Sequence, residues 1–430
     1  MDYEHNQPFN EISDDMASSK FFSVILFIAF FFLLFLYIRI SSILPFYFIF
    51  GFILLIGVIS TQKLYIEINQ LQKWWFIFIG YTLVTSIFAN NILGVSTEGS
   101  AKSSIAFFLI FIIVLYFVQF SDRICFFKII RNFLAICSIL GILEYITKFQ
   151  FYRNLITVDN IERTYQIYGI PGTPNYRLIL FFGHPIYFSI FLNIFLILLI
   201  YLPFNKKIIN IFFGFIGLIC LILTQSRSSW ISLIIVLILY LFNSHKINKI
   251  KLSRIIQILF SILILITFIY ILFYINPAFF QSISTILTDR INTILISPET
   301  ASGARLANLS LINYVPSIIM IIFGGGNGYA LSLLKMHPTV DGWTNAVDNQ
   351  YLTFLLDYGI IGLLIFLYFV IICIKTFFMS KDKINKMIIL LILSILITGY
   401  FFEFYKNMYV NYFLFILIAF VKENNKKIIL

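Results

Sequence analysis

Residues 342–362 read GWTNAVDNQYLTFLLDYGIIG, a polar segment that continues directly into a long apolar helix. The polar part closes a mostly polar stretch from about 276 to 349, which lies late in an otherwise apolar chain. The apolar blocks on both sides are about as long as a bilayer crossing requires. The pattern predicts a membrane platform that holds one large polar loop on one face.

The composition supports the membrane class. The chain has 430 residues, of which 60% are hydrophobic and 11% are charged, with a mean hydropathy of +0.97. Soluble domains have an apolar fraction nearer to half. We therefore expect an all-α polytopic membrane protein with about twelve transmembrane helices, although the last two blocks are short and a count of ten or eleven stays open. The predicted spans are 21–38, 42–60, 74–90, 104–120, 132–149, 178–202, 208–223, 228–243, 255–275, 350–374, 387–402 and 407–421.

The distribution of basic residues predicts the orientation. With the N-terminus in the cytoplasm, 19 of the 30 Lys and Arg residues lie on inner segments, including every dense cluster in a short loop. The net charge of +11 then indicates loops that face an anionic leaflet, not a nucleic-acid surface. The predicted organisation is a cytoplasmic tail at 1–20, helices one to nine within 21–275, an external loop with amphipathic helix segments at 276–349, helices ten to twelve within 350–421, and a cytoplasmic tail at 422–430.

Arginine and lysine divide differently between the two sides. Sixteen of the 20 lysines fall inside, whereas 7 of the 10 arginines fall outside. The positive-inside bias gives arginine no reason to prefer the outer side, but its planar fork suits bidentate contact with phosphate. Chance together with snorkelling at the interface is the alternative, and it covers Arg39. The outer arginines are Arg39, Arg153, Arg163, Arg177, Arg227, Arg290 and Arg305.

Two arginines stand in distinctive segments. TQSRSSW, Thr224 to Trp230, is a short polar turn between apolar helices, so Arg227 must face water, lipid phosphate or a ligand. Arg305 begins a segment that extends to Ile322 with an apolar face at helical spacing and a break at Pro316, which predicts an interfacial or re-entrant helix. Its charge is either an exposed helix start or a phosphate ligand.

The glycine run GGGNG, at 324–328, follows this helix. It frees the backbone for a tight turn. No strand precedes it, so it is not a nucleotide-binding loop. Either a phosphate-cradling turn or a flexible link would fit.

Candidate acid–base residues lie at the mouth of the tenth span. Asp348, followed by Asn349 and Tyr351, is placed to accept a proton from a sugar hydroxyl or to cap the helix. Asp357, one to two turns further in, is a weaker second candidate. No clusters with metal-ligand spacing occur, and no disulfide framework is expected from the four cysteines.

Two histidines each precede a proline and so mark turns or helix irregularities. His184 is expected to make a packing hydrogen bond, and His337 is a candidate base or sugar contact.

The order of these motifs resembles a known family. TQSRSSW, then a long loop with an Arg-led helix and a glycine turn, then DNQYLTFLLDYGIIGLLIF, is similar to the O-antigen polymerase/O-antigen ligase superfamily over roughly Leu178 to Ile374. In the ligase branch the segment before the tenth span usually reads His-Asn-x-Tyr-Leu, whereas this chain has Asp348 in the first position. That departure favours a polymerase of O-antigen or capsular repeat units.

The resemblance implies a metal-independent glycosyl transfer, without cofactor, at the outer face of the bacterial cytoplasmic membrane. Donor and acceptor would both be undecaprenyl-diphosphate-linked glycans, and a chain-length regulator and a flippase are candidate partners. It implies that Arg227 and Arg305 hold the diphosphate and that Asp348 is the base or orients the acceptor. The expected substrate-binding residues are Arg177, His184, Arg290, His337, Asn349 and Tyr351.

Three alternatives stay open. A ligase would share the donor but transfer the glycan to lipid A core, and a peptidoglycan-type glycosyltransferase would differ in its loop motifs. A flippase or transporter of the same lipid-linked sugar would place charges near the midplane in repeat-related helices. This chain has few such charges, among them Glu144 and Glu403, and no evident repeat.

Overall fold

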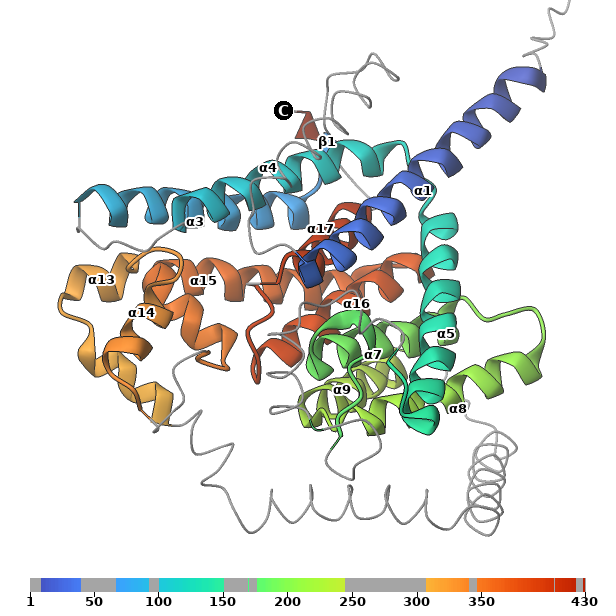
Figure 1. Ribbon diagram of the computed structural model, residues 1–430. Coiled ribbons are helices and arrows are strands. Elements are labelled where there is room, and N and C mark those ends of the chain that lie inside the picture. Colours follow the sequence, from blue (N-terminus) through green and yellow to red (C-terminus); the bar gives the residue numbers. More distant parts are fainter. Residues whose placement is uncertain are drawn as a thin grey trace, which may run out of the picture.

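The computed structural model describes residues 9–39, 67–92, 100–150, 169, 176–243, 307–339, 346–405, 407–422 and 428–429. Nearly all of this part is helical (Figure 1), as the sequence predicted; its one β pairing joins the two-residue strands β1 (Glu67–Ile68) and β2 (Ile428–Ile429). The helices are α1 (Phe9–Arg39), α3 (Gln70–Ile92), α4 (Ser100–Gln119), α5 (Arg123–Thr147), η2 (Leu180–Phe182), α7 (Pro185–Tyr201), α8 (Lys207–Leu223), α9 (Arg227–Asn243), η4 (Asn308–Tyr314), α13 (Ile318–Phe323), α14 (Tyr329–Met336), α15 (Gln350–Met379), α16 (Lys383–Gly399) and α17 (Met408–Phe420).

Several of these helices suit a bilayer. Within the described ranges, three are long and apolar enough to cross a membrane: Ala101–Gln119, Arg123–Thr147 and Gln350–Met379. Shorter apolar helices include α7, α8, α9 and α17. The spans expected at 42–60 and 255–275 lie outside the described residues, so the count of twelve stays a prediction.

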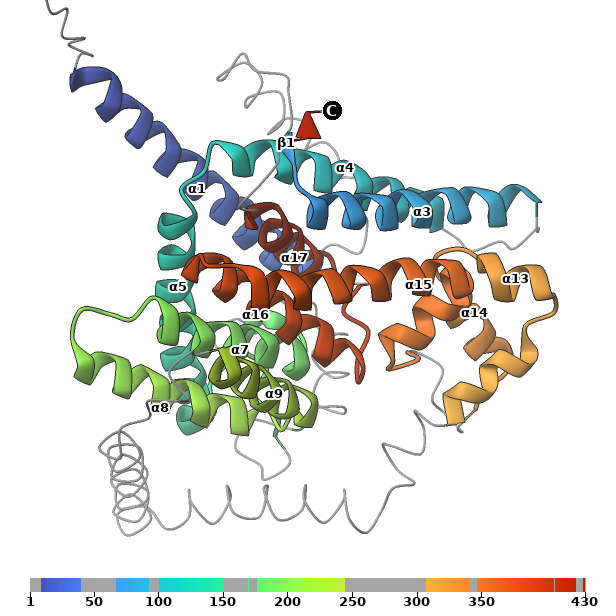
Figure 2. The same cartoon turned by 180° about the vertical axis from the view of Figure 1, so that it is seen from behind.

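The centre of the bundle consists of helices that are apolar on every side. α17 is buried along its whole length and lies between the α3–α4 pair and the α15–α16 pair (Figures 1 and 2). α7 is likewise buried almost throughout. A helix that is hydrophobic all round has no solvated face and belongs in a core. By contrast, the outer helices expose apolar side chains such as Ile208, Ile211 and Leu364, which suits contact with lipid.

Small polar side chains join three core helices. Ser189 of α7 lies 2.5 Å from Ser229 of α9 between hydroxyl oxygens, and Asn193 Nδ2 donates to the Ser229 carbonyl over 2.8 Å. Ser232 of α9 donates to the Ser394 carbonyl of α16 over 2.8 Å. Small residues let membrane helices approach closely, and such hydrogen bonds satisfy polar groups that lipid cannot. The serines that follow Arg227 therefore fix α9 within the bundle.

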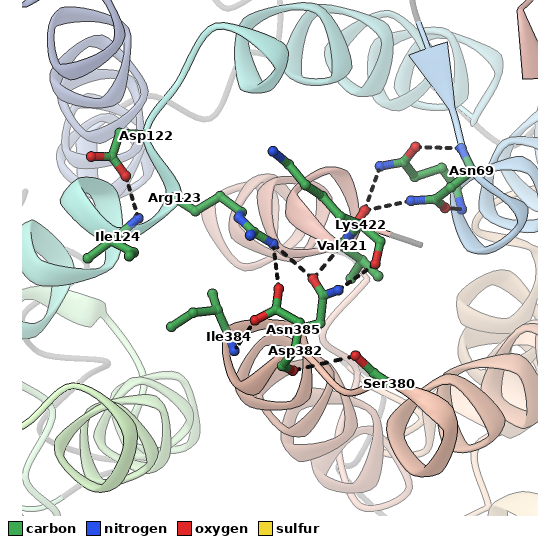
Figure 3. A network of polar contacts seen from close by, with 11 residues as sticks. Asn69, Asp122, Arg123, Ile124, Ser380, Asp382, Ile384, Asn385, Val421 and Lys422 are labelled. Atoms are coloured by element: carbon green, nitrogen blue, oxygen red, sulfur yellow. Dashed lines mark hydrogen bonds and ion pairs between the residues drawn. The ribbon is translucent and has the colours of Figure 1, made fainter. Parts of the chain in front are cut away.

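One end of the bundle is held by a polar network (Figure 3). Arg123, the first residue of α5, contacts Asp382 over 3.2 Å and donates to Asn385 Oδ1 over 2.9 Å. The Lys422 backbone N–H also donates to Asn385 Oδ1, over 3.0 Å, and Asn69 Nδ2 donates to the Val421 carbonyl over 2.6 Å. The network joins the starts of α3, α5 and α16 to the end of α17. That this end faces the cytoplasm stays a prediction from the charge pattern.

The boundary of α5 differs from the predicted span at 132–149. Asp122 caps the helix by accepting from the Ile124 and Cys125 amides, so α5 begins at Arg123. Arg131, expected in an inner loop, lies on this helix instead. It donates to the Leu202 and Pro203 carbonyls and stacks over a phenylalanine ring. These contacts satisfy an otherwise costly buried guanidinium.

α15 is two helices joined at a kink. Gly359 has φ 68° and ψ −175°, so residues 350–358 form a short helix before the long segment 360–379. The kink packs against the backbone of Gly324, whose φ is 91°. A Cβ at Gly359 would lie 2.3 Å from the Ile322 carbonyl oxygen, and one at Gly324 would lie 2.3 Å from that of Asp357. Only glycine permits both this conformation and this approach.

We expect Gly359→Ala to destabilise the protein by about 2 kcal/mol or more, because it adds left-handed strain and a backbone clash. Thermal unfolding in detergent measures the effect. Gly80→Ala is the matched control, since a Cβ there meets nothing within 4 Å. Equal melting temperatures for the two variants would contradict the role assigned to the kink.

Candidate functional site

Two arginine-carrying segments that the sequence predicts in outer loops lie side by side. The Leu178 amide donates to the Leu223 carbonyl over 3.0 Å, and Arg177 Nε donates to the Thr224 carbonyl over 3.2 Å. Gln225, with φ 53°, donates from Nε2 to the Tyr176 carbonyl over 3.3 Å. This pairing brings Arg177 to the turn that leads into Arg227, the first residue of α9. Both guanidinium-bearing residues are half-buried.

The Arg177 segment is anchored from α5. The Tyr176 hydroxyl donates to Glu144, a carboxylate that is buried near the end of that helix. Gln150 Nε2 donates to the same hydroxyl over 3.0 Å. Glu144, which the sequence showed as a charged residue within an apolar span, therefore supports the segment that carries Arg177.

His184 lies seven residues after Arg177 and connects the Arg177 segment to a further part of the protein. It precedes α7 as its N-cap, and its Nδ1 accepts from the Ile186 amide over 3.1 Å, as the expected packing hydrogen bond requires. The imidazole centroid lies 4.7 Å from that of Phe402. The ring thus joins the arginine segment to the connection between α16 and α17.

That connection, residues 400–407, reaches the Asp348 segment. Glu403 is only 4% exposed, and its Oε1 accepts from the Val347 amide over 3.1 Å and from the Thr353 hydroxyl over 2.7 Å. Gln350 Oε1 accepts from the Tyr405 amide over 2.8 Å. Sequence reasoning did not assign Glu403 to the site. The available signal was a carboxylate among aromatic residues, FFEFY, directly between two apolar helices.

Asp348 adopts a left-handed conformation immediately before α15, with φ 54°. Asn349 is the residue that caps the helix, since its Oδ1 accepts from the Tyr351 and Leu352 amides over 3.0 and 3.1 Å. The alternative that Asp348 acts as the cap is therefore wrong. A non-glycine residue held at positive φ costs of order 1 kcal/mol and is a frequent feature of functional sites.

The remaining side chains of this segment are turned into the protein. The Tyr351 hydroxyl donates to the Leu396 carbonyl over 3.2 Å, so its ring packs against α16. Asp357 is buried and accepts from the Gly328 amide over 3.0 Å and the Ala330 amide over 2.7 Å. Asp357 therefore binds the first turn of α14 and has a structural role.

The glycine run is a packed connection. All five backbone amides of 324–328 donate within the protein. Their acceptors are the carbonyls of Met320, Leu356 and Asp357, the Ser86 hydroxyl and the Asp357 carboxylate. A phosphate cradle needs amides that point at a ligand. Neither alternative from the sequence, phosphate cradle or flexible link, describes this turn.

The segment after Arg305 lies against the Asp348 segment. Arg305 and Arg290 themselves lie outside the described residues. Asn308 is buried and donates from Nδ2 to the Val347 carbonyl over 2.9 Å. The expected helix is broken near Pro316 into η4 and α13.

His337 is exposed at the end of α14 and stacks on Tyr314, with ring centroids 4.2 Å apart. This stacking holds the His337 ring on the 307–339 segment.

Together these contacts connect the segments that carry the two motifs. Arg177, the turn before Arg227, His184, the 400–407 connection and Asp348 follow one another through backbone and side-chain contacts. The connected segments carry cationic groups and a carboxylate, the residue types that can hold a diphosphate and accept a proton.

Comparison with known proteins gives one family. Residues 212–367 match the family model described as O-antigen ligase. This segment runs from α8 into α15 and contains Arg227 and Asp348. No curated protein matches the chain. Proteins of this family are multi-pass membrane enzymes that transfer glycans from lipid carriers. Over residues 212–367, the chain is therefore similar to the O-antigen ligase family.

Proposed function

We propose that this protein polymerises oligosaccharide repeat units carried on undecaprenyl diphosphate, as O-antigen or capsular polysaccharide, at the outer face of the bacterial cytoplasmic membrane. The observation that carries the proposal is the series of contacts that connects the Arg177–Arg227 segments to the Asp348 segment. A diphosphate-linked donor requires cations for its leaving group, and an acceptor hydroxyl requires a base.

The cationic side would bind the donor. Arg227 and Arg177 offer planar forks to the diphosphate oxygens, which carry increasing charge as the glycosidic bond breaks. Arg305 is proposed as a further ligand. It precedes Asn308 by three residues, and three residues of chain span at most about 11 Å. Asn308 itself contacts Val347, the residue before Asp348.

The transfer would be a single displacement. The acceptor hydroxyl oxygen attacks the anomeric carbon of the donor sugar and forms the new glycosidic bond. The bond to the diphosphate oxygen breaks, and its electron pair leaves with the undecaprenyl diphosphate. The hydroxyl proton passes to Asp348. Inversion at the anomeric carbon follows from the single displacement. His184 and Asn349 would contact sugar or phosphate oxygens as hydrogen-bonding groups.

Ligation to a lipid A core is the second candidate function, and the description of the matching family favours it. The aspartate at position 348, where the ligase branch usually carries histidine, favours polymerisation. A flippase of the same lipid-linked glycan is the candidate from a different class.

A glycan ladder from cells lacking the gene tests the function. We expect single repeat units on the final acceptor and no ladder, with the ladder restored by the wild-type gene. A normal ladder that accumulates on carrier lipid would instead indicate a ligase. Single units confined to the inner leaflet would indicate a flippase.

A further inference from the structure

We propose that Glu403, on the connection between α16 and α17, is a positioning residue that holds Asp348 in its working conformation. The inference rests on the proposed function, since it concerns the residue proposed there as the base. It adds a side chain from outside the 212–367 segment to the site.

Val347, the residue before Asp348, is held at both of its backbone polar groups by buried side chains. Glu403 Oε1 accepts from the Val347 amide over 3.1 Å, and Asn308 Nδ2 donates to the Val347 carbonyl over 2.9 Å. Val347 itself is fully buried. The two contacts therefore fix the two peptide groups on either side of Val347, from two segments that are far apart in the sequence.

The other side of Asp348 is fixed by α15. Asn349 caps the helix, and the Thr353 hydroxyl, one turn in, donates to the same Glu403 oxygen over 2.7 Å. Glu403 Oε1 thus bridges the backbone N–H of Val347, the residue before Asp348, and the first turn of α15. A left-handed aspartate persists only when its neighbours fix it, because the conformation is disfavoured on its own.

The position of Glu403 also explains why a charged residue occurs in this connection. A buried carboxylate is costly unless hydrogen bonds satisfy it, and here two donors meet one oxygen. His184 contacts the neighbouring Phe402 ring. Glu403, which contacts the Asp348 segment, therefore directly follows the residue that contacts His184.

The role requires an acceptor oxygen at this position. Glutamine has nearly the same shape as glutamate and keeps a side-chain oxygen that can accept, whereas leucine has no acceptor. A displacement of about 1 Å in a catalytic group costs up to about a hundredfold in rate. We expect Glu403→Leu to lower kcat about 10- to 100-fold with the KM for the donor changed less than about threefold, and Glu403→Gln to retain kcat within about threefold.

The experiment uses the full-length protein reconstituted in liposomes with an undecaprenyl-diphosphate-linked repeat unit. Rates are normalised to folded protein, and melting temperatures are measured for each variant. The matched control is Gln72→Leu. Gln72 is also a buried side chain that bridges helices, since its Nε2 donates to the Ala419 carbonyl over 2.7 Å, but at the opposite end of the bundle. The Gln72→Leu variant should have a lower melting temperature than the wild type and retain its kcat.

Two results would overturn the proposal. The first is a Glu403→Leu variant with wild-type kcat. The second is a loss of kcat in both Glu403→Leu and Gln72→Leu that is proportional to the fall in each variant's melting temperature. Loss of kcat in Glu403→Gln equal to that in Glu403→Leu would overturn the acceptor-oxygen role. An inactive wild-type protein would contradict the proposed function itself, whereas an active wild type with unaffected variants would contradict only the role of Glu403.

Discussion

Asp348→Asn is expected to reduce the polymerisation rate by about 100- to 10,000-fold, the range that a positioned general base contributes. Asparagine keeps the shape of the side chain and tolerates the left-handed conformation found at this residue, so the variant removes the base without adding backbone strain. The rate is measured on purified protein with the lipid-linked repeat unit, together with the melting temperature.

Asp382→Asn is the matched control for this change. Asp382 caps α16 and contacts Arg123 at the opposite end of the bundle. Asparagine also caps helices well, so this variant should keep most of the activity. If Asp348→Asn polymerised the repeat unit at the wild-type rate, Asp348 would have no role as a base.

Arg227→Lys is expected to lower the rate by about 100- to 1,000-fold, comparable to removing one donor that stabilises a developing oxyanion. Lysine retains the positive charge but loses the planar fork that contacts two phosphate oxygens at once. The backbone should be little affected, because the serines that follow Arg227 carry the contacts of α9 with α7 and α16. The assay is the same as for Asp348.

Arg123→Lys provides the comparison. Arg123 contacts Asp382 and Asn385 through one nitrogen, Nη1, which an ammonium group can replace. Its activity should stay within about threefold of wild type. An Arg227→Lys variant as active as Arg123→Lys would show that charge alone suffices at position 227, and the bidentate diphosphate role would fail.

The helical character of the chain could be predicted because apolar blocks of bilayer length carry a strong and local signal. The residues at which the helices begin and end could be predicted less well. α5 begins at Arg123 because Asp122 caps it, so basic residues expected in a loop occupy its first turns. The kink at Gly359 depends on the approach of Gly324, a contact between segments 35 residues apart that no local pattern reveals.

In the candidate site, too, residues with a local sequence signal could be predicted and residues that depend on tertiary contacts could not. Arg227 and Asp348 stand out because charges at helix ends in an apolar chain require an explanation, and the structure relates their segments through the 400–407 connection. Glu403 and Asn308 were missed because their importance comes only from contact with Val347. The glycine run was misread because its sequence permits a phosphate cradle, whereas tertiary contacts use all of its amides.

The most direct test of the proposed function is a reconstitution with one substrate. The purified protein in liposomes receives only the undecaprenyl-diphosphate-linked repeat unit, and the products are separated by mass. The account predicts carrier-linked dimers and longer chains, with one undecaprenyl diphosphate released for each bond formed. No carrier-linked oligomer, together with glycan transfer once a lipid A core acceptor is added, would contradict it and make the protein a ligase.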